Sequence, residues 1–493
     1  MPREGIHKLL ITTQMGLKAH LFFFGFSIKK YYYCTPGSAC SQTRPGTPFI
    51  IHPYPLNMPN TNPLRPLFKL LAAFALCASL CYACCEKPKP IDKQDGLCYI
   101  TENVGDGSVK DKLLNKGRRE IRQAYYCDEI IVWPDQDDSK MRPVYDTLTA
   151  LGFVKKDSCE CLEGIQLWGL PTTPPQDFDL LGIVKGVKAK ISSSGSGQAS
   201  VSANYALDLD LQREANDNFD GAGPTPTVPP GYSSIIVGVI DGGVNRQHVL
   251  LQGVSSADTC GNAADSNGHG THVSGVVADW NPRGKNGAFV PSCATCNLSP
   301  TVLSVKVTRG NSSQGSLFQA VCGMLYAVKR GACVLNLSWG FYSKEQPALL
   351  KKFADLHSEV LLVAAAGNDS LDLDQISGSL LVWPASLTAT CSNVLSVAAC
   401  DTAGNYAPFS NRSKRYVDLL APGVGIWSAD FKGSGGLVSS SGTSMAAPFV
   451  SRAAALYLAK NPYSGASDVK KVLIGFSNNR VLKDSTLLKS CCP

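Results

Sequence analysis

The sequence predicts an α/β protein, a doubly wound and mainly parallel sheet preceded by a small α+β unit. Over the second half of the chain, segments rich in Val, Ile and Leu alternate with segments of helical spacing, which is typical of parallel strands joined by helices. The strand segments are apolar at successive positions, as in a sheet that is covered on both faces. A Pro- and Gly-rich stretch at 211–232 separates them from an earlier segment of mixed character.

The composition is that of a globular protein. The chain has 493 residues, of which 44% are hydrophobic and 17% are charged, so it is long enough for two or three domains. Its formal charge of +7 comes from the N-terminus, because residues 1–90 hold ten Lys and Arg against two Asp and Glu. The remainder is nearly neutral, and we expect no nucleic-acid partner.

The N-terminus has the pattern of a signal peptide. Arg65 and Lys69 precede an apolar run at 70–80, which ends in small residues and cysteines at 81–85. The run is shorter than the roughly 20 residues that a membrane-spanning helix needs, although a signal anchor remains the alternative. We therefore predict a signal peptide over 58–85 and a secreted or cell-surface protein.

Two further predictions concern the same end of the chain. Met58 lies a suitable distance before the apolar run, and residues 1–57 show no useful periodicity, so we interpret 1–57 as an upstream extension that is not part of the native protein. Cys84 or Cys85, behind small residues, is a loose match to the lipid-attachment cysteine of a bacterial lipoprotein. Membrane contact is thus expected only through the signal or a lipid anchor.

Cysteines are abundant, with nineteen in the chain. After a signal peptide they predict disulfides. Four lie between the signal and the linker and nine lie beyond the linker, and because nine is odd, one thiol is free or pairs elsewhere. The spacing does not give the connectivity. Zinc is the alternative at Cys293 and Cys296, but no second pair at ligand spacing follows.

The segment 91–210 is predicted to be a small domain of its own. Its periodicity is compatible with a ferredoxin-like β-α-β-β-α-β order, with strands at 128–133, 164–168 and 199–207 and helices at 141–151 and 178–187. The stretch 211–232 follows as a linker, and the second domain is predicted to cover 233–493.

The first group with potential chemistry is Asp241. It ends an apolar, β-branched strand at 233–240 and precedes a glycine turn. Open α/β sheets place their sites at the carboxyl ends of such strands. Taken alone, an aspartate in this position is more often a turn or helix-capping residue.

The second group is His269, which lies between Gly268 and Gly270 at the start of an apolar helix. The glycines allow close backbone approach and leave the imidazole accessible. His272 follows three residues later, so a metal pair on one helix face is conceivable. The glutamate of a metalloprotease motif and a third ligand are missing, and we predict no metal here.

The chain then continues the alternation of strands and helices. We predict strands at 302–307, 333–340 and 360–368 and helices at 317–328 and 349–356. Because crossovers between parallel strands are right-handed, the ends of these strands should lie along one edge of the sheet. The last of these strands ends in Gly367 and Asn368.

Ser444 is the last group of the series. It lies in a Gly-Thr-Ser turn at the start of an apolar run that extends to 458 and predicts a buried helix. Pro448 falls near the first helical turn, where backbone N–H groups have no helical partner. A serine at a helix N-terminus sits where free N–H groups favour negative charge, as an acyl-transfer nucleophile requires.

Asp241, His269, Asn368 and Ser444 supply the groups that serine-based acyl transfer needs. Serine needs an adjacent imidazole as base, and the imidazole needs a carboxylate that fixes its tautomer. The oxyanion of the tetrahedral intermediate needs donors, here the Asn368 side-chain amide and the Ser444 backbone N–H. This chemistry requires no cofactor.

These residues give the sequence its resemblance to the subtilisin-like serine proteases, whose chain order is also Asp, His, Ser. The motifs that resemble the family's are Val-Ile-Asp241-Gly, Gly-His269-Gly-Thr-His, Ala-Gly-Asn368 and Gly-Thr-Ser444-Met-Ala-Ala-Pro, and they fall within about 232–475. The resemblance implies a subtilisin-like fold and a serine endopeptidase that acts on polypeptide substrates.

The resemblance also implies roles for other segments. The domain at 91–210 is similar to an N-terminal pro-domain, which assists folding, inhibits the enzyme from within the chain and is removed by a cut in or near 207–222. Ser338, Trp339 and Gly340 would pair with an extended substrate. The primary specificity pocket would be lined by these residues and by Ala364, Ala365, Ala366 and Gly367, whose small uncharged side chains imply an apolar or broad preference.

Departures from the family pattern are few. Gly242 replaces the more common Thr or Ser, and Trp339 is bulkier than the usual Leu, so it would narrow a pocket. The family often binds calcium, and Asp369, Asp372 and Asp374 form a candidate structural-calcium loop, although we favour a solvated loop. Two other functions compete. A catalytically silent binding scaffold would have no need to keep all four groups, and a lipase-type hydrolase would need Gly-x-Ser-x-Gly and another chain order.

Overall fold

A computed structural model describes most of the chain beyond residue 91. The described residues all belong to one compact unit, Lys87–Pro493. They are residues 92–94, 97–104, 119–159, 164–175, 178–195, 198–209, 232–251, 254–258, 264–265, 267–278, 299–308, 313–376, 380–478 and 481–482. The predicted extension, signal peptide, linker at 211–231 and Cys293–Cys296 pair lie outside these residues. Within them, no helix is both long and apolar enough to span a membrane.

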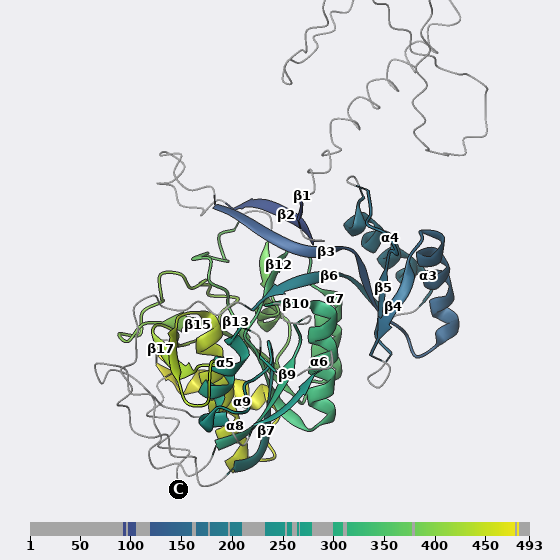
Figure 1. Cartoon of the computed structure of the whole chain (residues 1–493). Helices are drawn as coiled ribbons and strands as arrows, with labels where there is room; N and C mark the ends of the chain where they lie inside the picture. Colours follow the sequence, from purple (N-terminus) through teal and green to yellow (C-terminus); the bar gives the residue numbers. More distant parts are fainter. Residues whose placement is uncertain are drawn as a thin grey trace, which may run out of the picture. The chain divides into compact units, whose positions relative to one another are not determined.

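A parallel sheet forms the centre of residues 232–482, which we call the C-terminal region. Among the described residues its strands lie in the order β19-β20-β16-β15-β13-β11-β7-β9-β8, and every pair is parallel except β19 with β20 (Figure 1). In chain order the strands are β7 (Tyr232–Asp241), β8 (Ser255–Asp258), β9 (Ser299–Lys306), β11 (Ala332–Leu337), β13 (Leu361–Ala365), β15 (Val394–Cys400), β16 (Leu419–Pro422), β19 (Ser477–Asn478) and β20 (Val481–Leu482). This confirms the predicted α/β fold with a parallel sheet.

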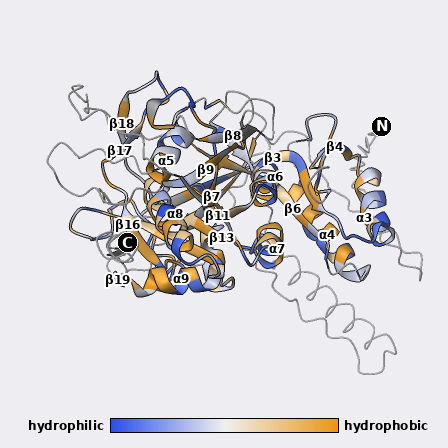
Figure 2. Ribbon diagram, turned by 90° about the horizontal axis from the view of Figure 1, so that it is seen from below, coloured by the Kyte–Doolittle hydropathy of each residue, from blue (hydrophilic) through white to orange (hydrophobic). Residues whose placement is uncertain are grey.

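Helices cover both faces of this sheet. Val237 and Val239 of β7 belong to one apolar cluster, and Ile240 belongs to the other, as the two-residue period of a strand requires. The first cluster includes residues of α5 (His269–Val277), α8 (Thr443–Lys460) and α9 (Ala466–Gly475), and the second includes residues of α6 (Leu317–Lys329) and α7 (Ala348–Leu356). The central strands β7, β11 and β13 are accordingly coloured as hydrophobic in Figure 2.

Several elements that the sequence did not predict complete the region, including β8, β15, β16, β19, β20 and α9. Shorter ones are the antiparallel pairs β12 (Phe341–Ser343) with β14 (Leu381–Trp383) and β17 (Ile426–Ala429) with β18 (Leu437–Ser440), and the 3₁₀ helices Val249–Leu251 and Ala385–Ala389. One predicted boundary is wrong, because the strand predicted to reach 340 ends at Leu337. Residues 338–340 leave the sheet and continue into β12.

Residues 92–209, which we call the N-terminal region, form an antiparallel sheet with two helices. The elements are β1 (Asp92–Gln94), β2 (Leu97–Val104), β3 (Arg119–Trp133), α3 (Asp138–Ala150), β4 (Val154–Ser158), β5 (Gln166–Gly169), α4 (Leu180–Ser193) and β6 (Ser200–Asp208). The long strand β3 pairs with β2 through residues 119–126, and its later half lies between β5 and β6. Strand β4 lies beyond β5.

The helices of the N-terminal region follow the predicted periodicity with one change. Helix α3 buries Met141, Val144 and Leu148, and the Asp137 carboxylate caps it by accepting from Ser139 N. Helix α4 buries Leu180, Val184, Val187 and Ile191, whereas the prediction placed Phe178, Leu181, Val184 and Val187 on one face. A face that repeats every third residue drifts around a helix of 3.6 residues per turn, which explains the difference.

Strand β6 extends the N-terminal sheet into the C-terminal region. It pairs antiparallel with β10 (Gln314–Ser316), where Ala206 faces Ser316, Leu207 faces Gly315 and Asp208 faces Gln314. The apolar cluster around α6 and α7 also contains core residues of the N-terminal region, such as Ile131 and Trp133. The two regions therefore share one hydrophobic core on this face of the parallel sheet.

Candidate active site

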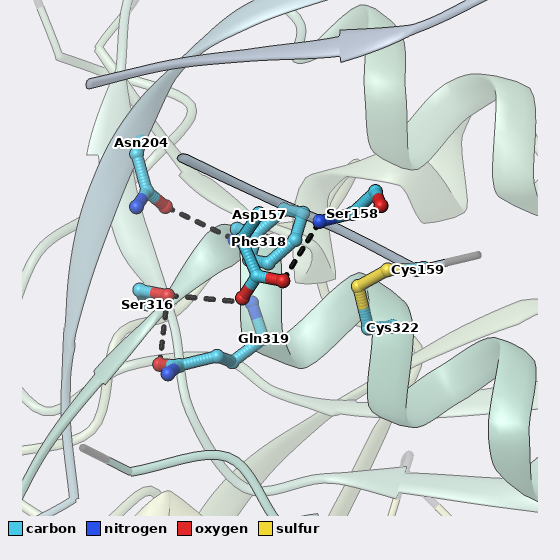
Figure 3. The surroundings of a disulfide bond; sticks show 8 residues. All are labelled: Asp157, Ser158, Cys159, Asn204, Ser316, Phe318, Gln319 and Cys322. Carbon is cyan, nitrogen blue, oxygen red and sulfur yellow. Dashed lines mark hydrogen bonds between the residues drawn. A yellow bond between two sulfur atoms is a disulfide. The ribbon is translucent and has the colours of Figure 1, made fainter. Parts of the chain in front are cut away.

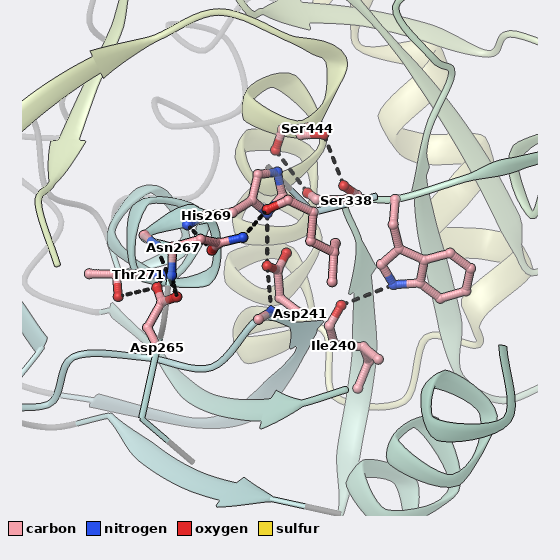
Figure 4. A network of polar contacts seen from close by, with 12 residues as sticks. Ile240, Asp241, Asp265, Asn267, His269, Thr271, Ser338 and Ser444 are labelled. Atoms are coloured by element: carbon pink, nitrogen blue, oxygen red, sulfur yellow. Dashed lines mark hydrogen bonds and ion pairs between the residues drawn. The ribbon is translucent and has the colours of Figure 1, made fainter. Parts of the chain in front are cut away.

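Asp241 and His269 meet at the carboxyl end of β7. Asp241 is the last residue of that strand, and His269 is the first residue of α5. His269 Nδ1 lies 2.8 Å from Asp241 Oδ1, which also accepts a hydrogen bond of 2.7 Å from Gly242 N. Both side chains are buried. In Figure 4 the imidazole lies between the Asp241 carboxylate and Ser444.

The start of α5 is fixed by a carboxylate that the sequence analysis did not single out. Asp265 Oδ2 accepts from Thr271 N at 2.8 Å and from Thr271 Oγ1 at 2.5 Å, while its Oδ1 accepts from Gly268 N at 2.9 Å and Asn267 N at 3.1 Å (Figure 4). Asn267 Oδ1 in turn accepts from His269 N at 3.0 Å. Burial raises the pKa of Asp265, although these hydrogen bonds oppose the shift.

Glycine is required beside His269. A Cβ on Gly270 would lie 2.1 Å from the carbonyl oxygen of Gly243, which is part of the turn after Asp241. Any side chain at 270 would therefore push α5 away from β7 and separate His269 from Asp241. This is the physical reason for the close backbone approach that the sequence predicted.

Ser444 is the second residue of α8, as the predicted helix start required. Its Oγ donates to Ser338 O at 2.9 Å, and Ser338 Oγ donates to Ser444 O at 2.8 Å. The predicted place of Pro448 needs a correction, because Pro448 is the sixth helical residue and lies beyond the first turn. Its missing N–H leaves Ser444 O without a helical donor, and the Ser338 hydroxyl supplies one instead.

Asn368 follows β13 and is held by α8. Its Oδ1 accepts from Thr443 N and from Thr443 Oγ1, each at 2.9 Å. Because the side-chain oxygen of Asn368 points toward Thr443, its side-chain nitrogen points away from Thr443. That nitrogen would lie 3.4 Å from a Cβ on Gly442, two residues before Ser444. Asn368 and Ser444 thus lie at neighbouring positions.

A second asparagine that the sequence analysis missed holds the backbone around Asn368. The buried Asn411 donates from Nδ2 to Ala366 O at 2.8 Å, and its Oδ1 accepts from Leu371 N at 3.0 Å and Asp369 N at 3.2 Å. The loop 366–371 is therefore pinned on both sides of Asn368. An asparagine far along the chain gave no sequence signal for this role, because its partners are forty or more positions away.

The residues predicted to bind substrate follow two neighbouring strands. Leu337 and Ala364 are paired in the sheet, and Ala365 is the last residue of β13, so residues 338–340 and 366–367 follow the ends of two neighbouring strands. Ala365 and Ala366 are buried. The indole of Trp339 is also buried and donates to Ile240 O at 3.0 Å.

The groups considered for metals have protein partners. Asp372 lies 3.5 Å from the Arg412 Nε, and Asp374 accepts from Ser413 Oγ at 2.7 Å and Lys414 N at 2.6 Å. His272 Nε2 faces Ile426 O at 2.9 Å, whereas His269 faces Asp241. No group of three or more His, Cys, Asp or Glu suited to a metal ion occurs among the described residues.

The end of β6 reaches this site. Leu209 N donates to Ser313 O at 3.2 Å, and Asn267 Nδ2 donates to Leu209 O at 2.6 Å. Asn267 is two residues from His269 and bonded to its backbone. Residues 206–209 therefore lie as an extended segment, paired with β10 on one edge and tied to the loop that carries His269.

Comparisons with known proteins give one consistent family. The family model described as "Subtilase family" matches residues 233–490. Subtilisin DY of Bacillus licheniformis is 33% identical over 254 residues, which cover 50% of this chain and 85% of the relative. The cell wall-associated protease of Bacillus subtilis is 34% identical over 245 residues, 48% of this chain and 25% of the relative. A solved "cold adapted subtilisin-like serine proteinase" has 27% identity and a TM-score of 0.40, covering 56% of this chain and 92% of the other.

Proposed function

The chain belongs to the subtilase family and is a serine endopeptidase, and we propose that Asp241, His269 and Ser444 form its catalytic triad. The observation that carries the proposal is the buried 2.8 Å contact between Asp241 Oδ1 and His269 Nδ1 beside Ser444. The carboxylate holds the imidazole with its other nitrogen toward Ser444 and stabilises the imidazolium that forms. A silent scaffold has no reason to bury this carboxylate against the imidazole, and we do not favour it.

The proposed reaction follows from these contacts. The Ser444 hydroxyl turns from Ser338 O toward His269 Nε2, gives up its proton there and attacks the scissile carbonyl. The oxyanion accepts hydrogen bonds from the Asn368 amide and the Ser444 backbone N–H. His269 then delivers its proton to the leaving amine, which yields an acyl-enzyme that water hydrolyses. No cofactor takes part in this chemistry.

We further propose that the substrate-binding residues are Ser338, Trp339, Gly340, Ala365, Ala366 and Gly367. Residues 338–340 follow β11 beside the end of β13, which is continued by residues 366–367, and this gives an extended peptide a backbone edge on which to pair. Without substrate, the carbonyl of Ser338 accepts a hydrogen bond from the Ser444 hydroxyl. A backbone N–H of the bound substrate would replace the hydroxyl as the donor. For the loop at 369–374 we propose that Arg412, Ser413 and Lys414, rather than calcium, hold the acidic side chains.

The N-terminal region is proposed to be a ferredoxin-like pro-domain that inhibits the enzyme until a cut in or near 207–222 matures it. Support comes from the extended segment 206–209, which pairs with β10 and bonds to Asn267 next to His269. We propose that this segment occupies space beside the His269 loop that a bound peptide substrate would need. Since the relatives include a cell wall-associated protease, we propose that the enzyme acts outside the cell.

The test compares the wild type with Ser444→Ala by intact mass and N-terminal sequencing under reducing conditions. We expect the wild type to begin within 207–232 and the variant to keep the N-terminal region. A serine-reactive fluorophosphonate probe should label the wild type and not the variant. Ser441→Ala, whose hydroxyl accepts from Gly425 N, is the matched control and should process and label normally. If Ser444→Ala is cut to the same extent as the wild type and Ser441→Ala, autoprocessing is refuted. If the probe fails to label Ser441→Ala but labels Ser444→Ala, the assignment of Ser444 is refuted.

A further inference from the structure

The disulfides among the described residues differ in what they connect. Cys98–Cys127 joins β2 to β3 within the N-terminal region, with a Cα–Cα distance of 5.0 Å. Cys159–Cys322 joins the N-terminal region to α6 of the C-terminal region, with a Cα–Cα distance of 5.9 Å (Figure 3). Both distances lie in the range that a disulfide spans without backbone movement. Only the second bond crosses the linker at 210–231 in sequence.

The surroundings of Cys159–Cys322 are ordered by hydrogen bonds on both sides. Cys159 follows β4, and its N–H donates to Ile165 O at 2.7 Å. Cys322 lies in the second turn of α6, and Ser316, the residue before this helix, caps its N-terminus. Asn204 of the N-terminal region also accepts a hydrogen bond there, from Phe318 N at 3.0 Å (Figure 3). Both cysteines are buried.

We propose that this disulfide keeps the N-terminal region attached after processing, so that the mature protein is a two-chain molecule. The inference rests on the proposed maturation cut. Any cut between residues 209 and 232 breaks the main chain, but Cys159 and Cys322 lie on opposite sides of it and remain joined. Cleavage alone then does not release the inhibitor.

The attachment changes how inhibition depends on concentration. The non-covalent contacts between the regions include the β6–β10 pairing, the stacking of Tyr205 on Phe341 at 4.4 Å and the bond from Tyr342 N to Gln123 at 2.6 Å. Without a covalent link, dilution would separate the cut pieces. With the link, the segment 206–209 stays at an effective concentration on the order of millimolar and rebinds after each opening.

Release therefore needs a second chemical event. A dithiol of the thioredoxin type would attack one sulfur as a thiolate and resolve the mixed disulfide with its second thiol. The protein disulfide gains two electrons and two protons and becomes two thiols, while the reductant becomes a disulfide. A second peptide cut within the N-terminal region would leave only a fragment attached to Cys322.

The covalent link can be tested without relying on self-cleavage. A recognition sequence for an added site-specific protease is placed within 221–231 of the Ser444→Ala chain, and the cut product is analysed by intact mass with free thiols blocked. We expect one species without reductant and two after reduction. The pair Cys159→Ser with Cys322→Ser should give two species in both conditions, and the pair Cys98→Ser with Cys127→Ser should behave like the parent. Two species from the parent without reductant would overturn the proposal.

Peptide mapping covers the case in which the double variant fails to fold. A non-reduced digest of the parent should contain a peptide pair linked through Cys159 and Cys322, and its absence would also overturn the proposal. The effect on activity is measured by diluting the processed wild type with and without prior reduction. Specific activity should stay constant on dilution before reduction and rise afterwards. If the wild type is not processed at all, the maturation proposal fails while the engineered cut still decides on the link.

Discussion

The N-terminal and C-terminal regions are stabilised in different ways. Each disulfide among the described residues uses at least one cysteine of the N-terminal region, whereas Cys333, Cys391 and Cys400 of the C-terminal region are free thiols. A small sheet buries less apolar surface than a long parallel sheet with helices on both faces, so it gains more from cross-links. Among the described residues, the disulfides therefore stabilise the N-terminal region more than the C-terminal region.

The regions also differ in how they satisfy buried polar groups. In the C-terminal region, the buried Asp241 and Asn411 find partners within the region itself. In the N-terminal region, Asn204 donates to Glu129 Oε2 at 2.6 Å, but its oxygen accepts from Phe318 N across the boundary. The candidate active site is therefore preorganised on its own, and the N-terminal region is shaped to fit against it.

The largest effect that would sharpen this comparison is expected at Asn368. Asn368→Ala removes one oxyanion donor and should lower kcat by about 10²–10³, the loss known for subtilisin itself. Asn368 Oδ1 also accepts from Thr443 N and Thr443 Oγ1, so the variant should in addition lose about 1 kcal/mol of stability and show a modestly lower melting temperature. Steady-state kinetics on a peptide substrate and thermal unfolding measure the two quantities. Asn405→Ala, at an exposed turn, is the control, and a fall in kcat below about tenfold for Asn368→Ala would contradict the role.

The next effect concerns the stability of the N-terminal region. Cys98→Ser with Cys127→Ser opens a loop with a sequence separation of 29, which should cost about 3–4 kcal/mol by the loop-entropy relation. Hydrogen exchange of the Ser444→Ala chain should show faster exchange in β2 and β3 and unchanged exchange in β13 and β15. Uniform loss of protection in all four strands would mean that the two regions unfold as one unit and would break the comparison.

A smaller effect, dependent on pH, is expected at Asp265. The two carboxylate oxygens of Asp265 together accept four hydrogen bonds, and Asp265→Asn replaces one of these oxygens by an NH₂ group that cannot accept. The free energy of unfolding should therefore fall by about 1–3 kcal/mol. Burial raises the pKa of Asp265, so the folded protein holds this proton more tightly than the unfolded chain does. The stability contributed by the protonated acid is full below the ordinary pKa of aspartate and declines as the pH rises through the folded pKa.

Asn does not titrate, so the difference in free energy of unfolding between wild type and Asp265→Asn should be largest in acid and shrink toward neutral pH. Urea unfolding at a series of pH values, in the Ser444→Ala background, measures it. Asp468→Asn, at an exposed position on α9, is the control and should show no such trend. A difference that grows with pH would reverse the assigned sign.

The smallest effect is a chemical one that leaves stability unchanged. Burial raises the pKa of Cys400 to about 12, and the neighbouring Asp401 adds to the shift. The thiolate is therefore scarce at neutral pH, and iodoacetamide should not label Cys400 in the folded protein, although it should label Cys333, which is half-buried. Mass spectrometry of labelled digests tests this. A disulfide found at Cys391 or Cys400 would show that the C-terminal region is cross-linked after all.

The sequence by itself determined the fold class and the placement of the principal site residues. Apolar, β-branched strands and helical spacing are local patterns, and they located β7, β9, β11 and β13 and helices α6 and α7 within a few residues. Asp241, His269, Asn368 and Ser444 each stand at the end of a strand or the start of a helix, and parallel strands bring such ends to one edge. Local periodicity and chain order were therefore sufficient for these inferences.

Only the tertiary structure decided which distant groups support them. The pairing of Cys159 with Cys322, at a sequence separation of 163, left no local pattern. The same holds for the hydrogen bonds of Asn411 to the loop 366–371 and for the burial of Trp339 against Ile240. Such contacts depend on where whole elements pack and which backbone groups they leave without a partner. Local sequence patterns specify the helices and strands. The hydrogen-bond partner of a carbonyl group and the disulfide partner of a thiol depend instead on how these helices and strands pack together.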